Sequence, residues 1–244
     1  LIFKKLFDKK LAYKSKTYVN YCPECKVVLA NEESQGGKCD RCGSDVVQKE
    51  KDVWFLKITA YCESLLEGVE HVNYLPRIKT EQINWIGKSE GAEVDFKVTN
   101  TDDKLRIFTT RPDTLYGATF MVIAPEHPLI EANKDKIHNM DEINAYLELT
   151  HKKSEFERVQ MNKDKTGICI DGLKGINPIT NKEIPIFVAD YVMMGYGTGA
   201  IMAVPAHDER DYAFAKKFNL PIIQVLEGGN IEEAAHTEDG LHIN

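Results

Sequence analysis

The sequence predicts an α+β protein in two parts, a small cysteine-rich and helical module over residues 1–88 and a β-rich domain over residues 89–244. Two C-x2-C pairs lie close together near the start of the chain. Apolar residues then recur at helical spacing up to residue 86, and short apolar runs typical of strands follow residue 89. A chain of 244 residues can bury a hydrophobic core without disulfides.

Charge is unevenly distributed along the chain. The totals of 31 Lys and Arg against 38 Asp and Glu give a net charge of −7, which argues against a surface that binds nucleic acid throughout. The first eighteen residues carry a net charge of +5, so a local basic patch is compatible with the composition. Because the chain begins at Leu1 and no signal peptide precedes it, we interpret it as part of a longer protein.

Three helical segments are predicted in the first part. Leu1 to Leu11 is amphipathic, with apolar residues on one side and lysines on the other. Apolar residues recur at helical spacing from Trp54 to Leu66, and Gly68 is a natural stop. Pro76 to Ile86 is a further helical or hinge segment that closes at Gly87.

The second part is predicted to be rich in strands. Alternating or continuous apolar residues indicate strands at 94–98, 105–109, 119–124, 167–170, 184–188, 201–204 and 221–226. Helices are expected from Asp141 to Glu157 and from Asp208 to just before Asn219. The apolar stretch 186–206 contains Asp190, three glycines and Pro205, which favours two buried strands around a turn over a membrane span.

The two cysteine pairs have the spacing of a metal site. Cys22 and Cys25 are separated by thirteen residues from Cys39 and Cys42, and the two pairs supply four thiolates on two tight turns, which suits tetrahedral Zn²⁺. Four thiolates leave no open coordination position, so this zinc would be structural. The alternative is a pair of disulfides or a site that has lost its metal.

The remaining cysteines, Cys62 and Cys169, lie among apolar residues and are expected in the core. Reduced cysteines and zinc together favour the cytoplasm.

A glycine-rich turn near the end of the chain imitates a nucleotide-binding motif. Residues 195–200 satisfy G-x-G-x-x-G/A. A dinucleotide site requires a helix to begin directly after the turn, whereas Ile201 to Pro205 indicates a strand closed by a proline. The turn is therefore interpreted as a place where backbone or substrate approaches closely.

Three segments carry a resemblance to a known family. They are 84–91 (Asn-Trp-Ile-Gly-Lys-Ser-Glu-Gly), 109–115 (Thr-Thr-Arg-Pro-Asp-Thr-Leu) and 195–212, which runs from Gly-Tyr-Gly-Thr-Gly through Ala-His-Asp-Glu-Arg-Asp-Tyr. Together they resemble the editing insertion of bacterial-type leucyl-tRNA synthetases, preceded by that family's zinc module. Valyl and isoleucyl enzymes have related insertions and share part of the H-D-x-x-D element, so they are an alternative. A noncatalytic zinc-ribbon module that binds nucleic acid is another.

The resemblance implies a β-barrel-like editing core with flanking helices, truncated at its C-terminal end. HIGH-type and KMSKS-type motifs are missing, so the synthetic active site, with its ATP and magnesium, would belong to the parent enzyme only. The implied activity is hydrolysis of the ester that joins norvaline, isoleucine or methionine to tRNA(Leu). The implied partners are the 3′ end of the aminoacylated tRNA and the remainder of the synthetase, with no membrane.

The resemblance also assigns roles to the threonine motif and its neighbours. Thr109 and Thr110 would contact the terminal ribose and the ester, and Arg111 would interact with substrate or tRNA. Thr114 would exclude leucine, because a β-branched side chain is stiff and occupies a fixed volume. The substrate pocket would be formed by Tyr196, Val204 and His207.

Two acidic residues at the start of the last predicted helix admit two interpretations. Asp208 and Asp211 have the spacing of a helix-capping pair, which by itself explains both. The resemblance implies that Asp211 binds the α-ammonium group of the substrate, while Asp208 caps the helix and helps to position the substrate. His207 beside Asp208 does not suggest a catalytic dyad, so a water molecule is the expected nucleophile.

Overall fold

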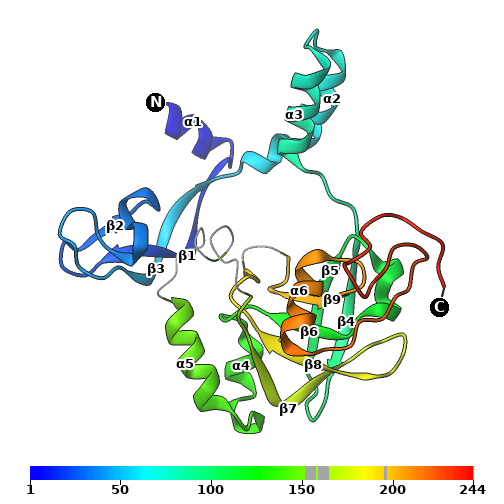
Figure 1. Ribbon diagram of the computed structural model, residues 1–244. Coiled ribbons are helices and arrows are strands. Elements are labelled where there is room, and N and C mark those ends of the chain that lie inside the picture. Colours follow the sequence, from blue (N-terminus) through cyan, green and yellow to red (C-terminus); the bar gives the residue numbers. More distant parts are fainter. Residues whose placement is uncertain (152–157, 159–164, 195–196, 244) are drawn as a thin grey trace. The chain divides into compact units, whose positions relative to one another are not determined.

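The computed structural model describes residues 1–151, 158, 165–194 and 197–243 (Figure 1). The chain divides into two compact units, Leu1–Glu90 and Gly91–Asn244. Within the described residues, no helix has the length and apolar character that a membrane span requires.

A three-stranded antiparallel sheet organises the first unit, in the order β2–β1–β3 (Figure 1). Helix α1 (Ile2–Asp8) precedes the strands, which are β1 (Ala12–Cys22), β2 (Val27–Leu29) and β3 (Val47–Leu56). The predicted N-terminal helix is therefore confirmed over seven residues. Trp54 packs edge-on against Phe3 and Phe7 of α1, with ring centroids 4.9 and 5.7 Å apart, so the apolar side of this helix covers one end of the sheet.

The helix predicted over residues 54–66 is wrong at both ends, since its predicted stop, Gly68, lies inside a helix that continues to His71. Residues 54–56 belong to β3, because their backbone pairs with residues 12–14 of β1. A short apolar run satisfies both the strand and the helix pattern, and pairing with a distant strand decides between them. Helical backbone begins with the 3₁₀ turn Ile58–Tyr61 and continues in α2 (Cys62–His71).

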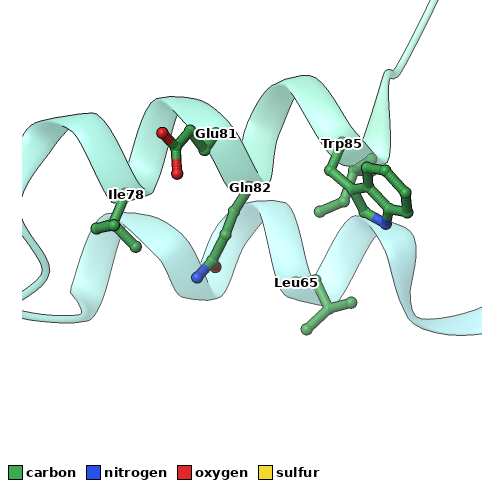
Figure 2. A pocket seen from close by; sticks show the side chains of 6 residues that line it. Leu65, Ile78, Glu81, Gln82 and Trp85 are labelled. Carbon is green, nitrogen blue, oxygen red and sulfur yellow. The ribbon is translucent and has the colours of Figure 1, made fainter.

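Helices α2 and α3 (Pro76–Ile86) form a hairpin. Gly87 ends α3 in the left-handed conformation at φ +61°, and its N–H donates to the carbonyl of Ile83 at 3.0 Å, which confirms the predicted helix and its stop. A pocket of about 410 Å³ lies along the hairpin and is lined by Leu65, Ile78, Glu81, Gln82, Trp85 and Ile86. Figure 2 shows the first five of these side chains. Trp85 is 90% exposed within this unit.

Six strands form the sheet of the second unit, in the order β5–β4–β7–β8–β6–β9. They are β4 (Ala92–Val98), β5 (Lys104–Thr109), β6 (Phe120–Ile123), β7 (Ile168–Ile176), β8 (Glu183–Val188) and β9 (Ala200–Ala203). Neighbouring strands are antiparallel, except for the parallel pair of β6 and β8. The edge strands β5 and β9 lie close to each other, so the sheet curves into a nearly closed barrel. The predicted α+β class with a barrel-like core is confirmed.

Strand β6, which lies between β8 and the edge strand β9, is buried on both faces, because alternate side chains enter two different clusters. Met121 and Ile123 pack in the larger cluster, with residues of β4, β5, β7 and β8. Phe120 and Val122 pack on the other side, where Phe214 of α6 (Glu209–Phe218) stacks on Phe120 with ring centroids 5.2 Å apart. Strand β6 therefore packs against the barrel interior with one face and against helix α6 with the other.

Two further helices flank the sheet (Figure 1), α4 (Pro128–Ala132) and α5 (Met140–His151). Helix α5 corresponds to the helix predicted from Asp141, and residues 152–157 of that prediction lie outside the described residues.

Two predictions for the second unit are wrong. Residues 221–226 form no strand, and only Leu226 makes an isolated bridge, to His242. Pro221 has no N–H to donate, and the N–H groups of Val225 and Leu226 bond to the ring of His207 instead of a neighbouring strand. Cys169 is exposed and not in the core, because it lies on the outward side of β7, where burial alternates along the strand.

Candidate active site and metal centre

The threonine motif turns out of strand β5 into the 3₁₀ turn Pro112–Gly117. Thr109 ends the strand, and its hydroxyl accepts a hydrogen bond from the N–H of Arg111 at 3.0 Å. Thr110 is exposed. Thr114 is only 2% exposed, and its hydroxyl donates to the carbonyl of Arg111 at 2.9 Å. This bond fixes the rotamer of Thr114 and uses its proton within the protein.

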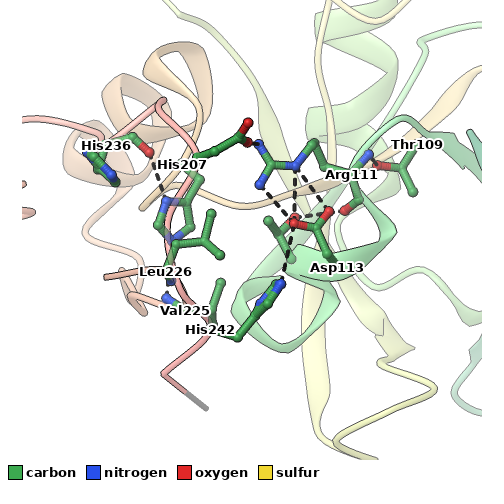
Figure 3. Close-up of polar contacts among 10 residues, drawn as sticks. Thr109, Arg111, Asp113, His207, Val225, Leu226, His236 and His242 are labelled. Carbon is green, nitrogen blue, oxygen red and sulfur yellow. Dashed lines mark hydrogen bonds and ion pairs between the residues drawn. The ribbon is translucent and has the colours of Figure 1, made fainter. Parts of the chain in front are cut away.

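Arg111 forms a bidentate ion pair with Asp113, with Nε–Oδ1 and Nη2–Oδ2 distances of 3.0 and 2.8 Å. The hydrogen bonds raise the pKa of the guanidinium and lower the pKa of the carboxyl group, so both groups stay charged. Two residues of the C-terminal segment, residues 221–243, lie beside the pair. Asp239 is 3.3 Å from Arg111. His242 is 4.0 Å from Asp113 (Figure 3).

Asp208 caps helix α6. Its side chain accepts hydrogen bonds from the N–H groups of Arg210 and Asp211, at 2.8 and 3.0 Å. Helix α6 ends at Phe218, and the capping residue Asn219 is left-handed at φ +52°, which agrees with the predicted end before residue 219.

Asp211 does not complete the capping pair. In a capping pair its carboxylate would accept from the backbone N–H of Asp208. Instead, its Oδ2 atom accepts from the N–H of Val204 at 2.9 Å, so the carboxyl group is directed to the end of β9. It is 7% exposed, and burial, with a smaller contribution from the Asp208 charge, raises its pKa to about 7. Among the described residues, no hydrogen bond reaches its Oδ1 atom. A buried carboxylate with a free oxygen can bind a cation.

The β6–β9 pair brings the two motifs together. Thr119, at the end of the threonine turn, donates its N–H to the carbonyl of Ala203 at 3.1 Å, directly before Val204. Gly117 lies so close to the buried Val204 side chain that a Cβ there would be 3.1 Å from its Cγ1 atom. Residues 109–119 and 203–211 therefore meet at one side of the barrel.

His207 has both ring nitrogens engaged by backbone groups (Figure 3). Nδ1 is 2.8 Å from the carbonyl oxygen of His236, while Nε2 is 3.1 and 3.2 Å from the N–H groups of Val225 and Leu226. This pattern requires a neutral ring that donates from Nδ1 and accepts at Nε2. Burial lowers the pKa of His207, which favours the same neutral form. The ring holds the C-terminal segment and offers no free nitrogen.

The glycine-rich turn is described in part. Tyr196, the predicted wall of the pocket, lies outside the described residues together with Gly195. Gly199 has φ +72°, and a Cβ there would collide with the sulfur of Met194, so close approach requires glycine. Its carbonyl accepts from the N–H of Ala124 at 2.8 Å, which ties the turn to β6.

Three residues around the site were not assigned roles from the sequence. Asp113 pairs with Arg111, and the opposite charge two residues away was the available signal. Asp239 and His242 reach the same pair from 126 and 129 residues further along the chain than Asp113 and carry no local signal.

The four predicted zinc ligands are gathered at one point in the first unit. The sulfurs of Cys22, Cys25, Cys39 and Cys42 all lie within 4.8 Å of one another, and none of the four forms a disulfide. Four thiolates at this separation can hold a metal ion tetrahedrally. The donor set therefore fits a metal, with two of its sulfurs in buried residues, Cys22 and Cys39.

Ser44 supports this cluster. Its hydroxyl lies 3.2 Å from the sulfur of Cys22 and 3.0 Å from that of Cys42. This contact is the largest cause of the lowered pKa of Cys22, which falls to about 6, so the Cys22 sulfur favours the thiolate form.

The two units match the two regions of one kind of enzyme. Residues 1–91 match the family described as tRNA synthetases class I (I, L, M and V), and residues 83–244 match the family described as "Leucyl-tRNA synthetase, editing domain". The fold and the two motifs thus define a piece of a class I aminoacyl-tRNA synthetase. The chain belongs to the leucyl-tRNA synthetase family, which the second match decides over the valyl and isoleucyl alternatives.

Individual relatives agree with this assignment. The chain is 58% identical to a leucine–tRNA ligase of Alkaliphilus oremlandii (strain OhILAs), across the whole chain and 30% of that protein. It is similar to the crystal structure of the ternary complex of Agrobacterium radiobacter K84 agnB2 LeuRS-tRNA-LeuAMS. That comparison has a TM-score of 0.67 and 36% identity, over 96% of this chain and 29% of that one. The chain spans about 30% of the length of these relatives.

Proposed function

We propose that this chain carries a post-transfer editing site, which hydrolyses the ester between a noncognate amino acid and the terminal adenosine of tRNA(Leu). The partners are the 3′ end of the charged tRNA and the remainder of the synthetase. The observation that carries the proposal is the buried Asp211 carboxyl group, whose Oδ2 atom accepts from the N–H of Val204 while no hydrogen bond among the described residues reaches Oδ1. Norvaline, isoleucine and methionine are the proposed substrates.

Asp211 binds the α-ammonium group of the aminoacyl ester. Burial raises the pKa of Asp211 and so disfavours the charged carboxylate, and an ammonium ion beside it offsets this cost with an opposite charge. The N–H of Val204 holds Oδ2, so the carboxyl group keeps one orientation and presents Oδ1 to the ligand.

Thr114 limits the side-chain pocket by volume. One methylene group is worth about 1–3 kcal/mol in a hydrophobic pocket, so a first binding step cannot reject close analogues of leucine and a second selection is needed. The hydroxyl of Thr114 is used by the carbonyl of Arg111, and the branched side chain is therefore a rigid obstruction. A catalytic role for this hydroxyl would require that bond to break.

The remaining residues orient the ester and a water molecule. Thr109 accepts from the Arg111 backbone and keeps its own proton for the terminal ribose, while the exposed Thr110 contacts the ester region. Arg111, held by Asp113, faces the tRNA backbone or substrate. Tyr196 and Val204 form the wall of the pocket, and the occupied ring of His207 positions the C-terminal segment. Water is the nucleophile, directed by these dipoles and by the free ribose hydroxyl.

The four cysteines hold a structural zinc ion in this proposal. Thiolate ligands at tetrahedral separation favour Zn²⁺, and their complete occupation of the coordination sphere leaves the ion no role in hydrolysis.

Release of isoleucine from isoleucyl-tRNA(Leu) by the chain tests the proposed activity. We expect Asp211→Asn to abolish release, because a neutral amide cannot neutralise the ammonium group. Glu209→Gln, which removes the same charge from an exposed position on the first turn of α6, should keep the rate of the unaltered chain. Equal rates for the two variants, or an inactive unaltered chain, would contradict the proposal.

A further inference from the structure

The two faces of the β1–β3 ribbon differ in charge. Directly opposite residues of an antiparallel pair have side chains on the same face, so the register assigns every residue of the ribbon to one face or the other. One face carries only neutral and basic side chains, and we name it the lysine face: Tyr13, Ser15, Thr17, Val19, Tyr21, Val47, Lys49, Lys51, Val53 and Phe55.

The opposite face neutralises its own charge. Its two lysines, Lys14 and Lys16, are matched by two carboxylates, Glu50 and Asp52, with Lys16 3.8 Å from Glu50 and directly opposite Asp52. Trp54 on this face packs edge-on against Phe3 and Phe7 of helix α1. This face therefore has few charges left for a ligand.

The lysine face combines free cations with aromatic rings. Lys49 and Lys51 both lie over the ring of Tyr21, 4.6 and 4.9 Å from its centroid, and no carboxylate of the described residues pairs with either. At the other end of the ribbon Tyr13 stacks on Phe55 with ring centroids 5.6 Å apart, and Tyr13 is 44% exposed. The two aromatic groups are about 26 Å apart along β1, at roughly 3.3 Å per residue.

We propose that the lysine face binds single-stranded RNA, with Lys49 and Lys51 on phosphates and the ring of Tyr13 under a base. The charge of the face is complementary to the RNA backbone, and exposed rings are the platforms on which unpaired bases stack. This inference rests on the proposed function, because it gives the tRNA a second place of contact on this chain, in the unit that lacks the proposed hydrolytic site.

Fluorescence anisotropy with a fluorescein-labelled single-stranded RNA dodecamer tests the surface. We expect Lys49→Gln with Lys51→Gln to weaken binding about tenfold or more and to reduce the salt dependence, d log K/d log[salt], by about 1.4, since each lost phosphate contact removes about 0.7. Tyr13→Leu keeps an apolar side chain without the ring and should weaken binding at least fivefold.

A matched variant distinguishes a specific face from net charge. Lys14→Gln with Lys16→Gln removes two charges from the opposite face and should change affinity less than threefold. Equal losses of RNA affinity in both double variants, or no loss in the Lys49→Gln and Lys51→Gln variant, would overturn the proposal. The lysine face would then be a surface for a protein partner.

Asp211→Asn separates this inference from the proposed function. It should abolish deacylation and leave dodecamer affinity unchanged. A chain that binds RNA through the two lysines but releases no amino acid would retain the surface and reject the hydrolytic site. A chain that releases amino acid but binds RNA equally well without the two lysines would retain the hydrolytic site and reject the RNA-binding surface.

Discussion

Replacing Asp211 by asparagine should make the chain more stable at neutral pH while it loses activity. The folded-state pKa of Asp211 is about 7, against an ordinary value of 3.8. Below pH 3.8 the group is protonated in both states. Between pH 3.8 and 7 the unfolded chain releases this proton and the folded chain keeps it, so rising pH lowers the free energy of unfolding. The difference in pKa corresponds to about 4 kcal/mol in total, at about 1.4 kcal/mol per unit.

Asparagine removes this pH dependence and can still accept from the N–H of Val204. The stability difference between Asp211→Asn and the unaltered chain should therefore grow by about 2–3 kcal/mol from pH 5 to pH 8. Urea unfolding followed by circular dichroism at several pH values measures this difference. Glu209→Gln, an exposed change on the same helix, is the control and should show no such growth. A stability difference for Asp211→Asn that does not change with pH would refute the reasoning.

Two further predictions concern the metal and His207. The reduced chain should bind one equivalent of zinc with Zn–S distances of about 2.3 Å, and Cys39→Ala should lose the ion. Metal analysis and X-ray absorption check both expectations. A folded, metal-free, disulfide-linked protein would contradict the assignment. His207→Phe should destabilise the chain by about 2–4 kcal/mol, because the N–H groups of Val225 and Leu226 lose their acceptor. Since the folded-state pKa of His207 is lowered, the contribution of this residue to the free energy of unfolding should decline as pH falls below about 6.5. Urea unfolding at several pH values measures this decline. An equal effect from His138→Phe, a change at an exposed histidine, would refute the prediction.

Features set by neighbouring residues could be predicted from the sequence. The stop at Gly87, the cap at Asp208 and the gathering of four cysteines each depend on side chains within about twenty residues, whose local chemistry is sufficient. The β-rich character of residues 92–204 also follows from local apolar patterns.

Features that depend on distant pairing could not be predicted in the same way. Residues 54–56 are strand because β1 lies beside them, and residues 221–226 are not strand because His207 takes two of their N–H groups. The free Oδ1 atom of Asp211 is likewise visible only once Val204 is placed, since the spacing from Asp208 alone suggested a second cap. The contacts of Asp239 and His242 with the Arg111–Asp113 pair join residues more than 120 positions apart.

The central claim is that the volume of Thr114 keeps leucine out of the editing site. The most direct test is to measure the release of leucine from leucyl-tRNA(Leu) by variants of this residue. We expect Thr114→Ala to raise this release about 10- to 200-fold, the range that corresponds to about 1–3 kcal/mol of opened space. Thr114→Val keeps the branched shape without the hydroxyl and should retain release of isoleucine and still spare leucine. Thr114→Tyr should stop release of both. If Thr114→Ala does not release leucine and Thr114→Val loses release of isoleucine, the hydroxyl is the essential feature and selection by volume at this residue is contradicted.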